Sequence, residues 1–111
     1  MKNLLLIAIS ASLMIGCAHV DVTKTGKGFY NPTNPNDIEI LKTIPKRHYE
    51  EVGMVTALRF NIDETAKMHN GIRAKTAPLG ANAVVLTEEG IMPNETLWAK
   101  GVALHYVDVK N

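Results

Sequence analysis

The sequence lacks most of the side chains that enzymes use for covalent catalysis. Its only serines, Ser10 and Ser12, lie in an apolar stretch at the amino terminus, and Cys17 is its only cysteine. The acidic pairs Glu50-Glu51 and Glu88-Glu89 are chain neighbours, and neighbouring side chains in a strand point to opposite faces, so neither pair forms a carboxylate dyad. We therefore expect a protein that is not an enzyme and needs no cofactor.

An excess of charge of one sign is also missing. Twelve Lys and Arg residues stand against eleven Asp and Glu residues in a chain of 111, and no basic run is longer than Lys46-Arg47. A surface that binds nucleic acid needs clustered positive charge to neutralise phosphates. We expect no nucleic acid among the partners of this protein.

Residues 1–16 have the pattern of an export signal. Lys2 precedes a largely apolar run from Leu4 to Ile15. As a helix this run would span about 18 Å, which is shorter than the roughly 30 Å hydrocarbon core of a bilayer. The pattern favours a signal peptide over a permanent transmembrane helix.

The end of this signal resembles the bacterial lipobox. An aliphatic residue and a glycine, Ile15 and Gly16, precede Cys17, although Met14 stands where leucine is usual. The resemblance implies cleavage between Gly16 and Cys17 and modification of Cys17 with diacylglycerol and palmitate, and several acyl chains hold a protein firmly on a membrane. Ala18, at the position that directs sorting, implies the outer membrane. We expect a lipoprotein on the periplasmic face of that membrane, in the bacterial cell envelope.

Residues 17–36 are predicted to be the lipidated cysteine and a flexible tether. The segment is rich in glycine, proline and asparagine and has little apolar periodicity. Phe29-Tyr30 is an aromatic pair in these polar surroundings, and it either docks back on the domain or touches a partner.

Residues 37–111 predict a small α+β domain in which a mostly antiparallel sheet packs on one helix in the order β-β-α-β-β. Ile38 and Ile40 alternate with polar residues in a short strand, and a longer strand follows from Arg47 to Phe60 with a bulge near Val52-Gly53. Two further strands, 83–87 and 97–109, are joined by a turn-rich connection.

The helix is predicted from Ile62 to about Ala77. Asn61 and Glu64 fit a capping box, and Pro78 ends the helix before Gly80 turns the chain. The apolar stripe of this helix is rather polar for a buried face. It comprises Ile62, Thr65, Met68, His69, Ile72, Thr76 and Leu79.

The last strand has two different faces. Small residues lie on one face and large apolar residues lie on the other, because side chains alternate along a strand. Ala99, Gly101 and Ala103 share the face that lets the helix approach closely. The opposite face is the candidate partner-contact surface, since one helix cannot cover both faces of a sheet; it carries Trp98, Val102, Leu104 and Tyr106.

The segment from Ile72 to Val85, which contains Leu79-Gly80-Ala81-Asn82-Ala83-Val84, resembles a pattern in the YbjQ-like proteins and the small envelope lipoproteins related to the Rcs stress sensor. There a helix ends in this motif and leads into a strand. The resemblance covers most of residues 49–103 and implies the fold and an envelope location. Gly80 and Asn82 are its structural turn residues, and neither disulfides nor a metal-ligand motif is carried over.

Four histidines, His19, His48, His69 and His105, are the candidate metal ligands. They include no His-x-His pair and no pair at i and i+4, so their spacing predicts no metal site. The function that these observations favour is a lipid-anchored envelope module that binds a protein partner, as a sensor or an assembly partner. The alternatives are a self-associating structural lipoprotein and a heavy-metal-binding domain.

Overall fold

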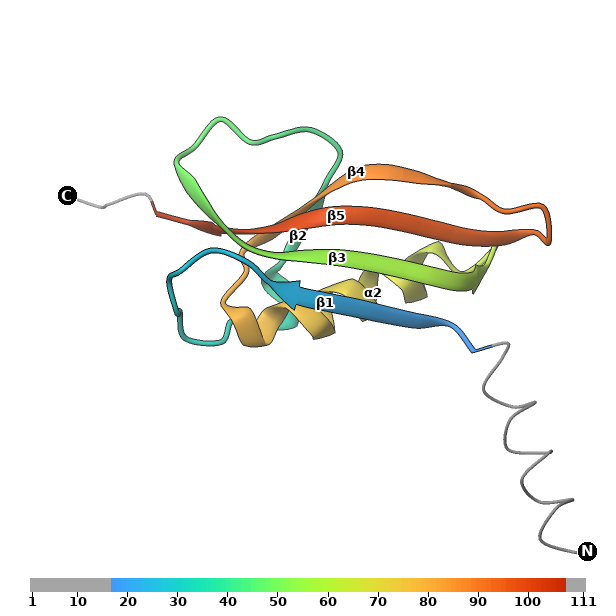
Figure 1. Ribbon diagram of the computed structural model, residues 1–111, viewed down its shortest axis with the longest axis horizontal. Coiled ribbons are helices and arrows are strands. Elements are labelled where there is room, and N and C mark those ends of the chain that lie inside the picture. The colour runs from blue at the N-terminus through green and yellow to red at the C-terminus, as the bar shows by residue number, and fades with distance from the viewer. Residues whose placement is uncertain (1–16, 108–111) are drawn as a thin grey trace, which may run out of the picture.

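The computed structural model describes residues 17–107, in which five strands form one sheet and an α-helix lies on one of its faces (Figure 1). The export signal, residues 1–16, lies outside the described residues, as do residues 108–111. The elements in chain order are β1 His19–Lys24, the 3-10 turn η1 Pro35–Asp37, β2 Glu39–Leu41, β3 Tyr49–Asn61, α2 Thr65–Thr76, the 3-10 turn η2 Ala77–Leu79, β4 Ala83–Ile91 and β5 Thr96–Tyr106.

The sheet has the strand order β1-β3-β5-β4-β2. All neighbouring strands are antiparallel except β2 and β4, which are parallel. This arrangement confirms the predicted α+β class with a mostly antiparallel sheet on one helix. The predicted bulge is also present, because the register of β3 against β5 shifts between Glu51 and Gly53.

Strand β1 corrects the prediction of a continuous flexible tether over residues 18–36. His19–Lys24 pairs along its whole length with β3, from His19 opposite Leu58 to Lys24 opposite Gly53. Val20 is buried and Val22 packs against the core, so a short period-2 alternation supplies the apolar side chains that hold this edge strand. The sheet therefore begins within three residues of Cys17.

The helix begins three residues later than predicted. Thr65–Thr76 is α-helical, and Glu64 accepts a hydrogen bond from the Asn61 backbone N–H at 3.0 Å in the turn before it. Ile62 lies in this turn and is half exposed, so it is not part of the buried stripe. The buried residues of the helix are Met68, Ile72 and Thr76.

Small side chains on β3 and β5 let α2 approach the sheet, as the sequence predicted. Ala57 and Ala99 face each other across the two strands, and both are almost completely buried. Gly101 is needed where β5 passes β4, because a Cβ there would lie 2.5 Å from the Val85 carbonyl oxygen. Ala103 is buried two residues further along and completes this row.

The segment between β1 and η1 lies beside the carboxyl end of α2 and contacts the sheet. Tyr30 stacks on His105 with 3.7 Å between ring centroids, and its hydroxyl donates a hydrogen bond to Glu50. Gly80 adopts a left-handed conformation with φ of 83°, and a Cβ there would lie 2.5 Å from the Tyr30 Cβ. Of the predicted aromatic pair, Tyr30 thus docks on the domain, whereas Phe29 remains 85% exposed.

Asn82 fixes the point at which β2, β4 and β5 meet. Its side-chain oxygen accepts a hydrogen bond from the Tyr106 N–H at 2.7 Å, and its backbone carbonyl accepts one from the Glu39 N–H at 3.1 Å. The predicted side-chain bond to backbone is present, but its partner lies 24 residues away in the chain. The motif thus sets the position of the end of β5.

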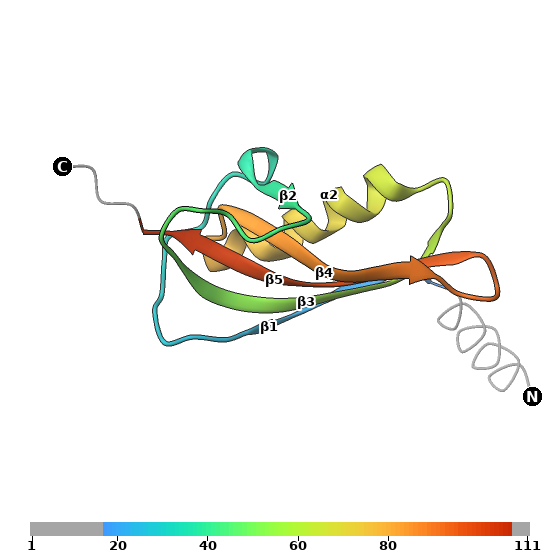
Figure 2. The same cartoon turned by 90° about the horizontal axis from the view of Figure 1, so that it is seen from above.

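The hairpin of β4 and β5 is longer than predicted and continues past the first turn of α2 (Figure 2). Its turn is closed by hydrogen bonds from the Met92 N–H to the Thr96 carbonyl and from the Glu95 N–H to the Met92 carbonyl, each 2.8 Å long. This end of the sheet is therefore not covered by the helix.

Candidate functional site

The four predicted contact residues lie along one side of β5 but have different surroundings. They share the outer face, which we define as the face of the sheet opposite α2, with Met54, Thr56, Val85, Thr87 and Lys100. Trp98, Val102 and Tyr106 are half-buried, whereas Leu104 is only 2% exposed. The prediction that Leu104 contacts a partner is therefore wrong.

Segment 42–48, which connects β2 to β3, lies close to Leu104 on the outer face. Ile44 from this segment and Tyr49 at the start of β3 line a hollow of about 70 Å³ together with Val102 and Leu104. Ile44 itself is 64% exposed, so it lies at the rim of this hollow. The chain thus covers part of the outer face with its own loop, and sequence periodicity gives no signal for such a contact.

Trp98 packs on its own hairpin. It pairs with Gly90 across β4 and β5, and a Cβ on Gly90 would lie 2.8 Å from the indole Nε1. The missing side chain at position 90 leaves the space that the indole occupies. Trp98 is therefore held at the far end of the sheet, about 26 Å along β5 from Tyr106.

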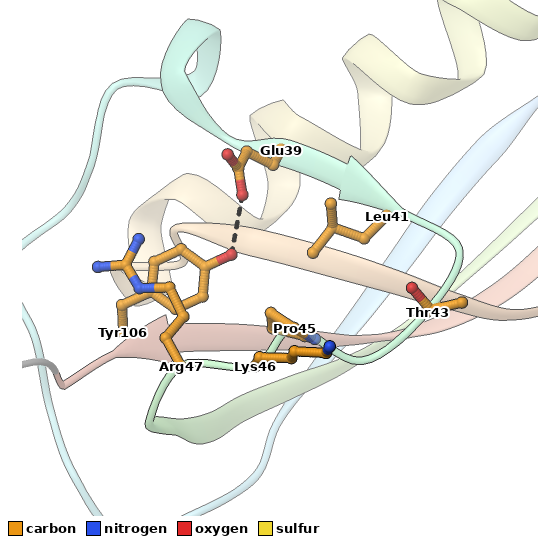
Figure 3. Close-up of a pocket in the computed structure, with 7 residues that line it drawn as sticks. All are labelled: Glu39, Leu41, Thr43, Pro45, Lys46, Arg47 and Tyr106. Carbon is orange, nitrogen blue, oxygen red and sulfur yellow. Dashed lines mark hydrogen bonds between the residues drawn. The ribbon is translucent and has the colours of Figure 1, made fainter.

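Tyr106 contributes to an open pocket of about 480 Å³ on the outer side of β2 and the end of β5. Figure 3 shows the residues that line this Tyr106 pocket, which are Glu39, Leu41, Thr43, Pro45, Lys46, Arg47 and Tyr106. Leu41, Pro45 and the tyrosine ring supply apolar surface, and the remaining residues are polar or charged. A pocket with this composition suits a ligand that has both apolar and polar groups.

The Tyr106 ring is held in place from several directions. Its hydroxyl donates a hydrogen bond of 2.8 Å to Glu39 Oε1 (Figure 3), and its backbone N–H is bound by Asn82. The Arg47 guanidinium lies 3.7 Å from the ring centroid, at a distance typical of a cation–π contact. The aromatic surface of the pocket is therefore formed before any ligand arrives.

Among these seven residues, only Tyr106 is predicted as a site residue from the sequence. Glu39 and Leu41 alternate with Ile38, which is buried just before β2, and with Ile40, which packs against the core, and this alternation is a signal that they face away from the core. Segment 43–47 carries no periodic pattern, and its position depends on where β2 and β3 join the sheet. The pocket is thus a product of the tertiary structure.

The histidines do not converge on one site. His19 lies 3.3 Å from Asp21 on the edge strand, His48 is exposed, His69 is on the helix, and His105 makes a 2.7 Å contact from Nδ1 to the Gly80 carbonyl oxygen. Within residues 17–107 no group of three or more His, Cys, Asp or Glu side chains is placed to hold a metal ion.

The residues of the predicted lipobox lie at the start of the described chain. Cys17 is exposed just before β1, and Ala18 packs against the edge of the core. Gly16, on the other side of the predicted cleavage site, lies outside the described residues. Over residues 17–107 we find no helix whose length and hydropathy would allow it to cross a membrane.

The fold of this chain is similar to that of a solved structure. A crystal structure of the Francisella virulence factor FvfA superposes with a TM-score of 0.57 at 14% sequence identity, and the match covers 78% of this chain and 97% of that chain. No family model matches the sequence, and the search of curated proteins gave no match. At this identity the likeness to FvfA concerns the fold alone.

His69 gives a prediction about pH. Its Nε2 atom is buried without a hydrogen-bond partner among the described residues. Burial lowers the pKa of His69 below its ordinary value, and the positive charges of Arg73 and Lys42 lower it further, with Glu89 acting in the opposite direction. The unfolded chain therefore binds a proton at higher pH than the folded chain does, so His69 reduces stability as pH falls below about 6.5.

When the pH is lowered from 7.5 to 5.5, we expect the free energy of unfolding, measured with urea, to fall less for His69→Gln than for the wild type. The exposed His48 serves as the matched position, and His48→Gln should keep the wild-type difference between the two pH values. Equal pH dependence in the His69→Gln variant and the wild type would contradict the account of His69.

Proposed function

We propose that this protein is a lipid-anchored module of the bacterial cell envelope that acts by binding a protein partner at the Tyr106 pocket. The observation that carries the proposal is the fixed aromatic surface of Tyr106, between Glu39 and Arg47, at the mouth of an open pocket. Tyrosine and arginine are common anchors of protein interfaces. A side chain that is already held in place loses little conformational entropy on binding.

The pocket favours a partner segment that combines an apolar side chain with polar groups. Leu41 and Pro45 offer apolar contacts beside the Tyr106 ring, while Lys46 and Thr43 lie at the same opening. The volume of about 480 Å³ is that of a few side chains rather than of an extended interface. We infer that the partner inserts a short segment here and contacts more of the outer face around it.

The proposed anchor lies at the opposite end of the sheet. Cys17 precedes β1, whose first residue pairs with Leu58 near the end of β3, whereas the pocket lies beside the last residue of β5. Strand β5 has eleven residues, and its length of about 33 Å separates the two ends. This separation would present the pocket away from the membrane that Cys17 holds.

Lipidation is tested by metabolic labelling. Cells that express the chain and grow with radiolabelled palmitate should incorporate label into the wild type and not into the Cys17→Ala variant, because the thiol is the proposed attachment point. Membrane fractionation should recover the wild type with the outer membrane, as Ala18 implies. Label on Cys17→Ala, or a wild type without label, would contradict the anchor, and recovery in the inner membrane would contradict the sorting.

Partner binding is tested by placing a photocrosslinking residue at Lys46, in the pocket, and at Lys75, an exposed lysine of α2, in otherwise identical full-length chains. We expect a discrete adduct from position 46 that is absent from position 75. Arg47→Ala should lower the yield of this adduct at least about fivefold, which corresponds to about 1 kcal/mol.

The identity of the adduct separates the candidate functions. A different protein crosslinked to position 46 would support the binding module. An adduct that contains only copies of this chain would support the alternative of self-association. Equal yields from positions 46 and 75, or an adduct that is insensitive to Arg47→Ala, would contradict recognition at the Tyr106 pocket.

A further inference from the structure

Three large apolar side chains are exposed at the end of the sheet from which Cys17 emerges. Ile62, Ile91 and Met92 are 50%, 66% and 45% exposed, respectively. Only three other large apolar residues among the described residues are comparably exposed, and these are Phe29, Ile44 and Met54. We call Ile62, Ile91 and Met92 the tip patch.

The strand register places the tip patch at one end of the sheet. Phe60 of β3 pairs with Leu97 of β5, and Leu97 pairs with Ile91 of β4, so the three side chains form one row across the sheet. Ile62 follows the last residue of β3, and Met92 follows the last residue of β4. Ile91 is therefore the exposed end of an apolar row, and Ile62 and Met92 lie at the same end of the sheet.

This row is continuous with the core. Phe60 is buried at 5% exposure, and Leu97 packs against the core from a half-buried position. Ile91 continues the row outward and is exposed because α2 does not reach the hairpin end (Figure 2). Apolar side chains in this position would be covered only by a surface outside the fold.

The start of β1 lies at the same end. β1 runs antiparallel to β3 and begins opposite Leu58, two residues before Phe60. Figures 1 and 2 both show the start of β1 at the end of the molecule that carries the turn of the β4–β5 hairpin. A lipid on Cys17 would therefore hold this end of the sheet close to the bilayer.

From this placement we propose that the tip patch inserts into the lipid surface to which Cys17 is anchored. This inference rests on the proposed lipidation of Cys17. The exposed charged residues nearby are Arg59, Asp63 and Glu95, and their charges have mixed signs. This surface therefore favours apolar contact with the bilayer over electrostatic attraction to anionic lipids. The tip patch would act as a second contact that sets the orientation of the anchored domain.

Trp98 reports on this contact directly. It is the only tryptophan of the chain, and it lies beside the row, since it follows Leu97 and pairs with Gly90. The experiment uses the mature lipidated protein in vesicles of zwitterionic phosphatidylcholine with brominated acyl chains, which quench tryptophan fluorescence at short range. We expect marked quenching of Trp98 relative to vesicles of unbrominated lipid, and a similar degree when anionic lipid is added.

Two double variants decide whether the tip patch is responsible. Ile91→Ser with Met92→Ser should remove at least half of the quenching, while lipidation and vesicle binding persist. Ile44→Ser with Met54→Ser is the matched control, because these residues are exposed to a similar degree but lie outside the tip patch. The control should keep the wild-type quenching.

The outcomes separate this inference from the proposed anchor. Lipidated protein on vesicles with unquenched Trp98 would overturn the insertion of the tip patch and leave the anchor intact. Equal loss of quenching in both double variants would also overturn it. A mature chain whose mass shows no lipid on Cys17 would overturn the anchor and, with it, the inference that depends on it.

Discussion

Close packing of α2 against a row of small side chains is the constraint on which the rest of the structure depends. Ala57, Ala99 and Ala103 are buried beneath the helix, and Met68 and Ile72 fill the space between helix and sheet. One helix of twelve residues covers only part of one face. The remaining apolar surface must be covered by connections or left for contacts outside the fold.

Two connections supply much of this cover. The segment before η1 closes the carboxyl end of α2 through the stack of Tyr30 on His105, and segment 42–48 lies against the outer face beside Leu104. The Tyr106 pocket forms where this second connection passes the end of β5. The candidate site is thus a consequence of how the chain covers the face that α2 leaves open.

The sequence predicted the features that depend on local pattern. The bulge of β3, the left-handed turn at Gly80 and the small-residue face of β5 each need only neighbouring residues for their recognition, and the structure confirms them. The edge strand β1 was missed because two alternating valines, followed by a segment rich in glycine and asparagine, are a weak signal. Their strand conformation depends on pairing with β3, which no local pattern reveals.

The candidate site was predicted only in part for the same reason. Alternation correctly placed Trp98, Val102, Leu104 and Tyr106 on one side of β5, but it carried no information about segment 42–48, which lies beside the buried Leu104. Alternation also did not separate the two ends of the strand, where Trp98 packs on Gly90 and Tyr106 meets Glu39. Long-range contacts therefore determine which residues of the predicted face are accessible.

The central proposal is that a lipid anchor on Cys17 and a recognition site at the Tyr106 pocket lie at opposite ends of the sheet. Neutron reflectometry of the lipidated protein on a supported bilayer tests it by measuring the thickness of the protein layer. A domain that stands on its hairpin end should give a layer about 35 Å thick, close to the length of β5. A layer of about 20 Å, the depth of one sheet and one helix, would mean that the domain lies flat and would contradict the account.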